Sequence, residues 1–339
     1  MRRPRHVGFG ALVGALALAP ACRSTSGSKT TGTGGAPAGS GGAGATGSAG
    51  TSGGAGTTGG AGTTGGAGTT GGAGTTGAAG TGGGVATDPC TTAIFCDDFE
   101  SYTVGQAPGG NWTKTTNQGA VAVDGGQFHS GSKSVKFTTM AAANAKTAFV
   151  HLISTTSKTI FPVPGNMFYG RMMFRLEAAP TTSVHWTMIA GSGIVAGQNY
   201  HALYRYGGQL PITSGSTFVG SQLMANYETP DSYSGNGPSS DCWFHSNQVV
   251  VPVATWSCVE WQFDGPNNTM RLWLDGAAVP SLTVTGVGQG CVNQPATYPW
   301  TAPTFDRLDL GWESYQQDDP RTFYIDDVVI STTPIGCPQ

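Results

Sequence analysis

The chain has 339 residues, of which 55 are glycine and only 10% are charged. The glycine excess is local, because 27 of these glycines lie in residues 23–84, where no aliphatic side chain is larger than alanine. Such a segment cannot bury a hydrophobic core. Residues 88–339 contain all 8 tryptophans, which suits one domain with a large core. They also contain all 19 acidic residues against 11 basic ones, and this net charge of −8 argues against a nucleic-acid binder.

Residues 1–22 have the pattern of a bacterial export signal. Three arginines precede an apolar run over residues 7–19 that is too short to span a bilayer. Small residues then stand directly before Cys22, as at the end of a lipoprotein signal, although Ala19 occupies a position where such signals usually carry leucine. We therefore expect an exported protein of the outer membrane or cell surface, with a lipid on Cys22. In the alternative interpretation, Cys22 is an incidental thiol and the protein is extracellular.

Residues 23–87 are predicted to form a disordered, low-complexity linker. The hexapeptide Gly-Gly-Ala-Gly-Thr-Thr runs four times without variation over residues 53–76, and it has no apolar face by which repeats would stack. A flexible spacer of this kind gives an anchored domain the reach to contact a large polymeric partner.

Residues 88–339 have the pattern of an all-β domain. Short runs rich in β-branched and aromatic residues alternate by twos between clusters of glycine, proline, asparagine, aspartate and serine. We expect strands that include residues 134–138, 167–177, 200–206, 221–228, 258–263, 270–274, 307–312 and 322–330. This many strands in one unit favour a two-sheet jelly-roll sandwich of the concanavalin-like kind, whose concave sheet can hold an extended polymer.

Six of the 7 cysteines lie in this domain, an even number that suits three disulfides in an exported protein. A zinc site is the alternative, but the paired short Cys-x-x-Cys spacing of zinc sites is missing. The sequence alone does not choose among the possible pairings.

Several short motifs occur in an order and spacing that resemble one known family. They are DDFES at 97–101, HSGSKS at 129–134, WSCVE at 256–260, WLDG at 273–276, GWESY at 311–315 and YIDD at 324–327. From about residue 95 to the C-terminus, the chain resembles the cellulose-induced protein family of filamentous fungi. The resemblance implies a jelly roll related to glucuronan and alginate lyases, and a disulfide between Cys258 and Cys337. We prefer Cys90–Cys96 and Cys242–Cys291 as the remaining pairs.

Glu100, the carbonyl of Ser130 and Asp326 are candidate ligands of a structural calcium ion. They are hard oxygen donors from three regions of the chain, which suits calcium, and the resemblance implies such a site at matching positions. The site would tie the two ends of the domain together. Lys133 stands where the fungal members carry asparagine, so one side-chain oxygen is missing and a cation lies nearby. In the alternative interpretation, the two carboxylates are ordinary surface groups or pair with Lys133.

One predicted strand carries the candidate catalytic residues. The period of two puts His201, Arg205 and Gln209 on one strand face. Removal of the C5 proton of a uronate requires that its carboxylate be neutralised, which Arg205 and Gln209 can do through hydrogen bonds. His201 is the candidate base, and Tyr227 or Tyr315 is the candidate acid that protonates the departing glycosidic oxygen.

Residues 205–209 match an Arg-x-Gly-Gly-Gln element that, in the family it resembles, includes active-site positions. The histidine differs, because the fungal members place it two residues before the arginine, where this chain has Leu203. His185 and His245 are therefore alternative candidates for the base. In a further interpretation, the tyrosines face the groove while His201 and the arginine face solvent.

Three classes of function remain: a lyase of acidic polysaccharide, a glycoside hydrolase and a non-catalytic carbohydrate-binding module. A hydrolase needs two closely placed carboxylates, and Glu260 with Asp264 is the nearest approach. We predict a lyase that cleaves uronate-containing, glucuronan-like polysaccharide by β-elimination, with the binding module as the alternative. The expected partners are acidic or plant and microbial cell-wall polysaccharides, and calcium is the expected cofactor. We expect a monomer that touches a membrane only through a lipid on Cys22.

Overall fold

The computed structural model describes residues 88–141, 143–230 and 236–338. The predicted export signal, the predicted lipid attachment site and the predicted linker lie outside these residues. The described residues are almost all-β, as predicted. Their helices are three single 3-10 turns, η1 (Pro89–Thr91), η2 (Pro164–Asn166) and η3 (Pro280–Leu282). None of the helices in the described part of the chain is long and apolar enough to cross a membrane.

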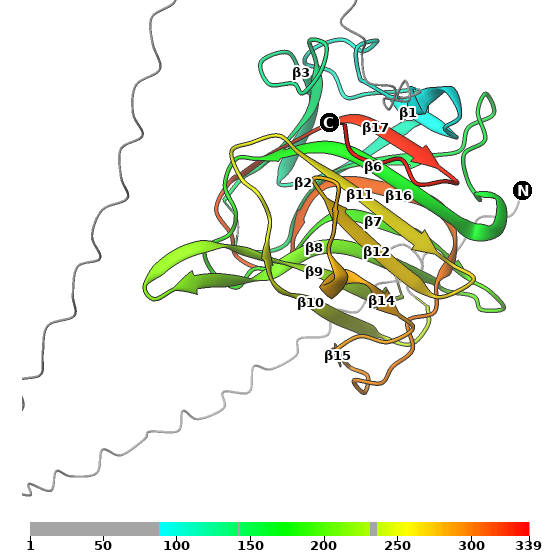
Figure 1. Ribbon diagram of the computed structural model, residues 1–339, viewed down its shortest axis with the longest axis vertical. Helices are drawn as coiled ribbons and strands as arrows, with labels where there is room; N and C mark the ends of the chain where they lie inside the picture. Colours follow the sequence, from blue (N-terminus) through cyan, green and yellow to red (C-terminus); the bar gives the residue numbers. More distant parts are fainter. Residues whose placement is uncertain (1–87, 142, 231–235, 339) are drawn as a thin grey trace, which may run out of the picture. The chain divides into compact units, whose positions relative to one another are not determined.

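Strands from both ends of the domain meet in an antiparallel sheet of nine strands. Its main path runs β13-β12-β11-β6-β17-β4-β3, with β1 paired to β17 and β14 paired to β12. The strands are β1 (Phe95–Asp97), β3 (Gly119–Asp124), β4 (Ser134–Thr139), β6 (Met167–Leu176), β11 (Ser257–Asp264), β12 (Thr269–Leu274), β13 (Ala277–Ala278), β14 (Val284–Thr285) and β17 (Arg321–Ser331). Because the first strand pairs with the last, residues 328–330 near the end of β17 lie beside β1 (Figure 1).

The second sheet has eight antiparallel strands in the order β15-β10-β9-β8-β7-β16-β5-β2. They are β2 (Trp112–Asn117), β5 (Lys146–Ile153), β7 (Trp186–Val195), β8 (His201–Ser214), β9 (Thr217–Thr229), β10 (Ser240–Val250), β15 (Gly290–Val292) and β16 (Pro303–Ser314). Each of the strands predicted from the sequence is present. The β8–β9 hairpin is longer than predicted, and its tip extends beyond the neighbouring strands (Figure 1).

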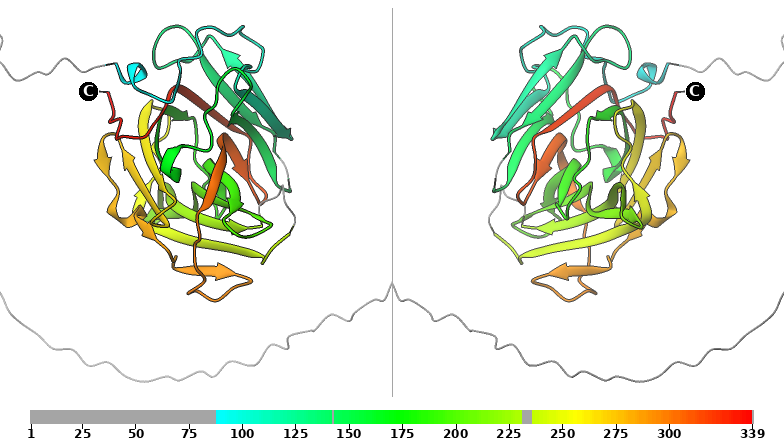
Figure 2. Two further views of the ribbon diagram at one scale, coloured as in Figure 1. Left: turned by 90° about the vertical axis from the view of Figure 1, so that its right-hand side faces the viewer. Right: turned by 90° about the vertical axis from the view of Figure 1, so that its left-hand side faces the viewer.

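The two sheets pack face to face around an aromatic core (Figure 2). The ring of Phe263 on β11 lies 5.8 Å from that of Tyr204 on β8, and Phe168 on β6 lies 5.4 Å from Phe305 on β16. Side chains at alternate strand positions therefore point into the sandwich, where each fully buried aromatic contributes about 2 kcal/mol of hydrophobic stabilisation. This arrangement confirms the predicted two-sheet sandwich.

One position in the core requires a glycine. Gly170 on β6 is paired with Trp261 on β11, and the indole ring lies directly over the glycine. A Cβ atom at Gly170 would come within 2.1 Å of the Trp261 ring, which is far inside van der Waals contact. The sequence permits this close approach because glycine has no side chain.

The three predicted disulfides are confirmed: Cys90–Cys96, Cys242–Cys291 and Cys258–Cys337. The second joins β10 to the edge strand β15, and the third ties the C-terminal tail to β11. Cross-links of this kind typically contribute about 2–4 kcal/mol by restricting the unfolded chain.

Candidate functional site

A row of residues crosses the outer face of the eight-stranded sheet, which is the face turned away from the core. Backbone pairing aligns five positions on β16, β7, β8, β9 and β10, and these are Asp309, Ala190, Arg205, Asn226 and Trp243. Tyr204 and Tyr206, the chain neighbours of Arg205, point into the core because alternate strand residues face opposite sides. The sheet register therefore brings polar groups together from strands far apart in the sequence.

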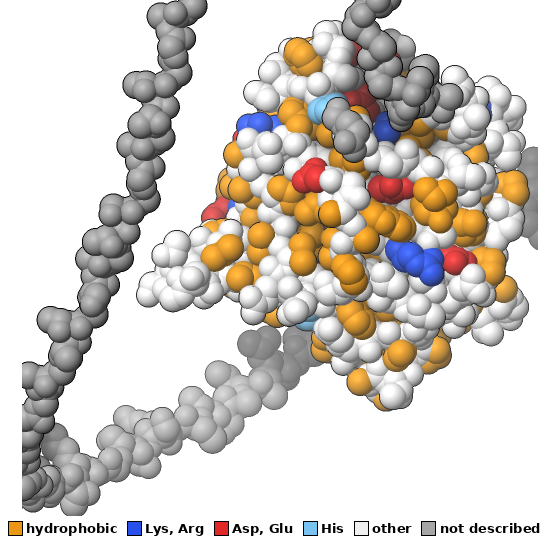
Figure 3. Space-filling view, in the orientation of Figure 1, with side chains coloured by type: hydrophobic (Ala, Val, Ile, Leu, Met, Phe, Trp, Pro, Cys, Tyr) orange, Lys and Arg blue, Asp and Glu red, His pale blue; other side chains and the backbone are white. Residues whose placement is uncertain are grey.

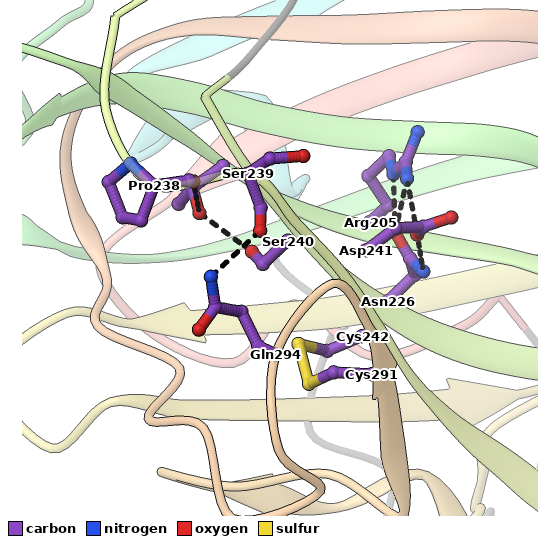
Figure 4. The surroundings of a disulfide bond; sticks show 10 residues. Arg205, Asn226, Pro238, Ser239, Ser240, Asp241, Cys242, Cys291 and Gln294 are labelled. Atoms are coloured by element: carbon purple, nitrogen blue, oxygen red, sulfur yellow. Dashed lines mark hydrogen bonds and ion pairs between the residues drawn. A yellow bond between two sulfur atoms is a disulfide. The ribbon is translucent and has the colours of Figure 1, made fainter.

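The side chain of Arg205 is buried, and its guanidinium makes several ion pairs and hydrogen bonds. Its Nε donates to Asn226 Oδ1 at 2.7 Å, its Nη1 lies 2.8 Å from Glu228 Oε2 and its Nη2 lies 3.4 Å from Asp241 Oδ1. Figure 4 shows Arg205, Asn226 and Asp241 pointing toward one another beside the Cys242–Cys291 disulfide. Burial alone would lower the pKa of the guanidinium, but the carboxylates of Glu228 and Asp241 outweigh it, so the charge is retained.

Tyr315 follows β16 directly and connects Arg205 to a carboxylate. Its hydroxyl accepts a hydrogen bond from Arg205 Nη1 and donates one to Glu313 Oε2. The guanidinium carbon of Arg205 also lies 5.0 Å from the centre of the tyrosine ring. Burial raises the pKa of the Tyr315 hydroxyl well above its usual value, although the charge of Arg205 opposes this rise. The hydroxyl is therefore protonated at neutral pH and has a proton to donate.

Arg205 and Tyr315 line a hollow of about 330 Å³, here called the arginine hollow. Its wall is formed by Thr115, Asn117, Ala145, Thr147, Phe149, Ala190, Leu203, Arg205, Glu228, Asp309, Glu313 and Tyr315. Among these described residues, three carboxylates face one guanidinium. The wall is therefore acidic overall, although it contains the arginine.

A second hollow, of about 380 Å³, adjoins the first and is here called the histidine hollow. It is lined by His185, Gln209, Met224, Asn226, Asp241, Trp243, His245, Val292 and Gln316. Asn226 and Asp241 line this hollow and accept hydrogen bonds from Arg205, which lines the arginine hollow, so the two hollows are neighbours. The ring of Trp243 rests against Gly290, where a Cβ would come within 2.4 Å of it.

The two histidines of this hollow are neutral at neutral pH. His245 Nε2 lies 3.3 Å from Gln209 Oε1, and burial lowers the pKa of its imidazole. His185 packs against Tyr315 with the ring centres 4.7 Å apart. Burial, and then the charge of Arg205, lower the pKa of His185 to about 3. A neutral imidazole has a nitrogen that can accept a proton, so both histidines have the protonation state of a base.

The structure brings together three of the five predicted catalytic residues, Arg205, Gln209 and Tyr315, around the two hollows. His201 is not among the described residues that line them. It begins β8, and the four-residue separation places its backbone roughly 13 Å from that of Arg205. His201 and Arg205 do share a strand face, as predicted. A single sugar ring is too short to contact both residues across this separation. The alternative histidines are the ones that lie near the arginine.

The prediction for Tyr227 was wrong. Its side chain is only 1% exposed and stacks on Trp300 in the core, with the ring centres 5.8 Å apart. Tyr227 follows Asn226 on β9, so it points to the opposite face of the sheet from the arginine hollow. Asn226 pairs with Arg205 and shares its face, so the next residue, Tyr227, must face the core.

Sequence reasoning missed several residues that complete the site, namely Asn226, Glu228, Asp241 and Glu313. The first two occupy alternate positions of β9, and the register of the β8–β9 hairpin would have placed them beside Arg205. Glu313 lies in the GWESY motif, two residues before Tyr315. The missing information was the strand register, which a sequence pattern does not specify.

The residues expected to hold calcium do not fit a calcium ion as they lie. Both carboxylate oxygens of Glu100 accept hydrogen bonds from residues 132–133. Asp326 Oδ2 accepts them from the backbone N–H groups of residues 129–130. The ammonium of Lys133 donates to the Glu100 carbonyl, a hard oxygen that a calcium ion would also use. No cluster of three or more histidine, cysteine, aspartate or glutamate side chains suited to a metal occurs among the described residues.

Three solved structures to which this chain is similar are the following. The cellulose-induced protein Cip1 is 24% identical to this chain with a TM-score of 0.48, and the match covers 72% of this chain and 100% of that one. An endo-β-1,4-glucuronan lyase from the fungus Trichoderma reesei is 16% identical with a TM-score of 0.45, and the match covers 71% of this chain and 96% of that one. The alginate lyase vAL-1 from Chlorella virus is 11% identical with a TM-score of 0.39, and the match covers 66% of this chain and 93% of that one. A search of curated protein sequences gave no match.

A family model matches most of the folded domain. It is described as a polysaccharide lyase-like, Cip1-like core domain, and it matches residues 98–333, which is more than half of the chain. The match confirms the family resemblance that the motifs carried. The chain therefore belongs to the Cip1-like family of polysaccharide lyase-like jelly-roll proteins.

Proposed function

We propose that this protein is a polysaccharide lyase that cleaves uronate-containing, glucuronan-like polysaccharide by β-elimination. The observation that carries the proposal is the contact chain from Arg205 through Tyr315 to Glu313, which adjoins a hollow with two neutral histidines. A protonated tyrosine and a neutral imidazole are the acid and the base that this reaction requires.

In the proposed reaction, His245 removes the C5 proton of a uronate ring. It is preferred over His185 because it is half-buried, whereas His185 is only 7% exposed and packs under Tyr315. The electrons of the broken C–H bond form the C4–C5 double bond as the C4–O glycosidic bond breaks. Tyr315 then donates its proton to the departing oxygen. The amide of Gln209, beside His245, hydrogen-bonds the uronate carboxylate and stabilises the charge that develops there.

Arg205 is a positioning residue in this scheme. All three of its nitrogens already donate to protein groups, among them Asn226, Glu228 and Tyr315. The guanidinium therefore orients the tyrosine hydroxyl and favours the negative charge that the hydroxyl acquires on losing its proton. This positioning role replaces the expectation from the sequence that Arg205 itself binds the substrate carboxylate.

The proposal is tested by incubating the protein with glucuronan, alginate and pectin and following the ultraviolet absorbance of the unsaturated product. We expect the His245→Ala variant to lose at least about 100-fold in kcat, because general bases contribute that much or more. His201→Ala, which alters a histidine on the same strand as Arg205 but outside both hollows, is the matched control and should retain wild-type activity. Equal losses in the two variants would contradict the assignment of the base.

A non-catalytic carbohydrate-binding module is the second candidate, and one observation favours it. The arginine hollow is acidic and its guanidinium is already paired, so it attracts an anionic uronate only weakly. Trp243 in the adjoining hollow could still stack on a neutral sugar. Retention of the protein on insoluble polysaccharide without any unsaturated product would support this function over the lyase. The hydrolase candidates Glu260 and Asp264 lie on β11 in the other sheet.

We further propose that the domain is exported and held on the outer surface of a bacterium by a lipid on Cys22. The export signal and the cysteine at its end support this location. Expression of the full chain with radiolabelled palmitate tests it: the label should appear on the wild-type protein and be lost in Cys22→Ser. An unlabelled wild-type protein in the culture medium would contradict the anchor.

A further inference from the structure

The side chain of Lys133 occupies the centre of the contact between two segments far apart in the chain. Lys133 lies in the loop just before β4, and its Nζ donates to the backbone carbonyl of Glu100 at 2.6 Å and to that of Tyr102 at 2.9 Å. Both carbonyls belong to the turn that follows β1. A charged donor shared between two carbonyls makes hydrogen bonds that are stronger than neutral ones.

The same two segments are joined by Glu100 in the opposite direction. Glu100 Oε1 accepts from the backbone N–H groups of Ser132 at 2.7 Å and Lys133 at 2.8 Å, and Oε2 accepts from the Ser132 hydroxyl at 2.7 Å. Gly131, with a φ of +61°, leaves room for this carboxylate, because a Cβ there would meet Glu100 Oε1.

The turn that receives the lysine has a strained backbone. Phe99, fully buried, has a φ of +58°, a left-handed conformation that costs a residue with a side chain roughly 1–2 kcal/mol. Asp97 supports the turn from one side, since its Oδ1 accepts from the Phe99 N–H at 2.9 Å. Lys133 supports it from the other side through the next carbonyls along the chain. The ammonium of Lys133 therefore helps to hold the strained conformation of the turn.

We propose that the ammonium of Lys133 is the resident cation of this site, and that the domain needs no metal ion to hold its N-terminal turn. A calcium ion takes six to eight oxygen ligands. The carbonyl of Glu100 is bonded to the ammonium instead, and the carboxylate oxygens of Glu100 and Asp326 accept backbone N–H groups. Ser130 links the loop onward, because its hydroxyl donates to Asp327 Oδ1 on β17 at 2.7 Å.

A covalently attached cation has a consequence for function, and this step rests on the proposed lyase activity. Polyuronates carry a carboxylate on every acidic ring, and carboxylates are good calcium ligands. An enzyme whose fold depended on calcium would compete for that ion with its own substrate. A lysine cannot be extracted by the polymer, so the fold of this domain is independent of how much polyuronate surrounds it.

The first test uses the wild-type protein and involves no polysaccharide, so its result does not depend on the lyase proposal. Thermal unfolding is followed in a chelator and in millimolar calcium chloride, and calcium binding is followed by titration calorimetry. We expect the same unfolding midpoint in both solutions and no saturable heat of binding. A midpoint that falls in chelator would overturn the proposal.

The second test replaces the cation. Lys133→Met keeps the aliphatic stem and removes the charge, and the loss of two charge-assisted hydrogen bonds should lower the midpoint by about 6 °C or more for a domain of this size. Lys136→Met is the matched control, because the ammonium of Lys136 makes a 3.8 Å ion pair with Asp124 and lies 5.5 Å from the centre of the Tyr324 ring, contacts that are weaker than two hydrogen bonds to carbonyls. An equal, small effect of both substitutions would refute the role of Lys133.

The third variant, Lys133→Asn, exchanges the ammonium for a side-chain oxygen and empties the space between the two carbonyls. We expect a lowered midpoint in chelator that calcium chloride partly restores, in contrast to the wild-type protein and to Lys133→Met. A Lys133→Asn variant that ignores calcium would show that the ammonium does not stand in a cation site. If Lys133→Met fails to fold, the chelator comparison on the wild type still decides the question.

Discussion

Replacing Tyr315 by phenylalanine removes a single oxygen from the candidate site and tests its chemistry most directly. The ring stays in contact with His185 and Arg205, whereas the proton donor between Arg205 and Glu313 is lost. General acid catalysis contributes roughly 10²–10⁴-fold, so we expect a fall in kcat of that order, or about 3–5 kcal/mol in the activation barrier.

The same substitution should affect stability only slightly. Arg205 keeps its contacts with Asn226, Glu228 and Asp241, so the cost is that of about one hydrogen bond, roughly 1–2 kcal/mol, or a few degrees in the unfolding midpoint. Binding of polysaccharide should survive, because the acid acts on the departing oxygen and not on ring recognition.

The assay follows the unsaturated product by its ultraviolet absorbance, with unfolding and polysaccharide retention measured on the same samples. Tyr169→Phe is the matched control, since Tyr169 is a half-buried tyrosine on the other sheet. A Tyr315→Phe variant with more than a tenth of wild-type kcat would refute the role of Tyr315 as the acid. Loss of activity together with loss of the fold would place the residue among the structural ones.

Three further outcomes follow from the contacts. Arg205→Met should abolish cleavage and also lower the free energy of unfolding by about 1–3 kcal/mol, because the buried amide oxygen of Asn226 loses its donor; wild-type stability measured by urea unfolding would contradict the burial argument. The pKa of His185 lies near 3 in the folded protein and near its ordinary 6.5 in the unfolded chain. Only the unfolded chain therefore takes up this proton as the pH falls below 6.5, and stability should drop by about 1 kcal/mol per pH unit toward pH 3. His185→Asn should reduce that slope, and an unchanged slope in urea unfolding across pH would refute the assignment. Gly170→Ala should cost about 3 kcal/mol or more because its methyl group collides with Trp261, while Gly109→Ala, which has open space around its Cβ position, should leave the unfolding free energy within about 0.5 kcal/mol of the wild type.

The charge around the candidate site limits which polymers suit it. Few charged side chains lie on the face over β11 and β12, where hydrophobic side chains gather in patches (Figure 3). On the other sheet, the arginine hollow carries more acidic than basic groups. Long-range attraction therefore does not draw a polyanion to this domain, and recognition of a uronate depends on short-range hydrogen bonds such as those of Gln209.

The fold was predictable because its signals are local. Alternation by twos placed strands such as β6 and β17, and the even number of cysteines indicated three disulfides. The motif at residues 205–209 identified Arg205 and Gln209 because family motifs are contiguous in sequence. The strand pattern and the motif each lie within a few residues of the chain, and the cysteine count needs only the composition, so none of them requires knowledge of which strands pair.

The composition of the site was decided by tertiary structure. Residues at alternate positions of a strand face opposite sides of the sheet, and the pairing with neighbouring strands decides which side is the core. Tyr227 therefore packs on Trp300 in the core, whereas Tyr315 contacts Arg205 at the hollow. Pairing between β8 and β9 brought Glu228 to Arg205, and the contact of the loop before β4 with the turn after β1 set Lys133 between two carbonyls. The sequence by itself determined which segments become strands, since that depends on local alternation. Only the folded sheets determined which side chains meet, because strand register and long-range contacts depend on the packing of the whole domain.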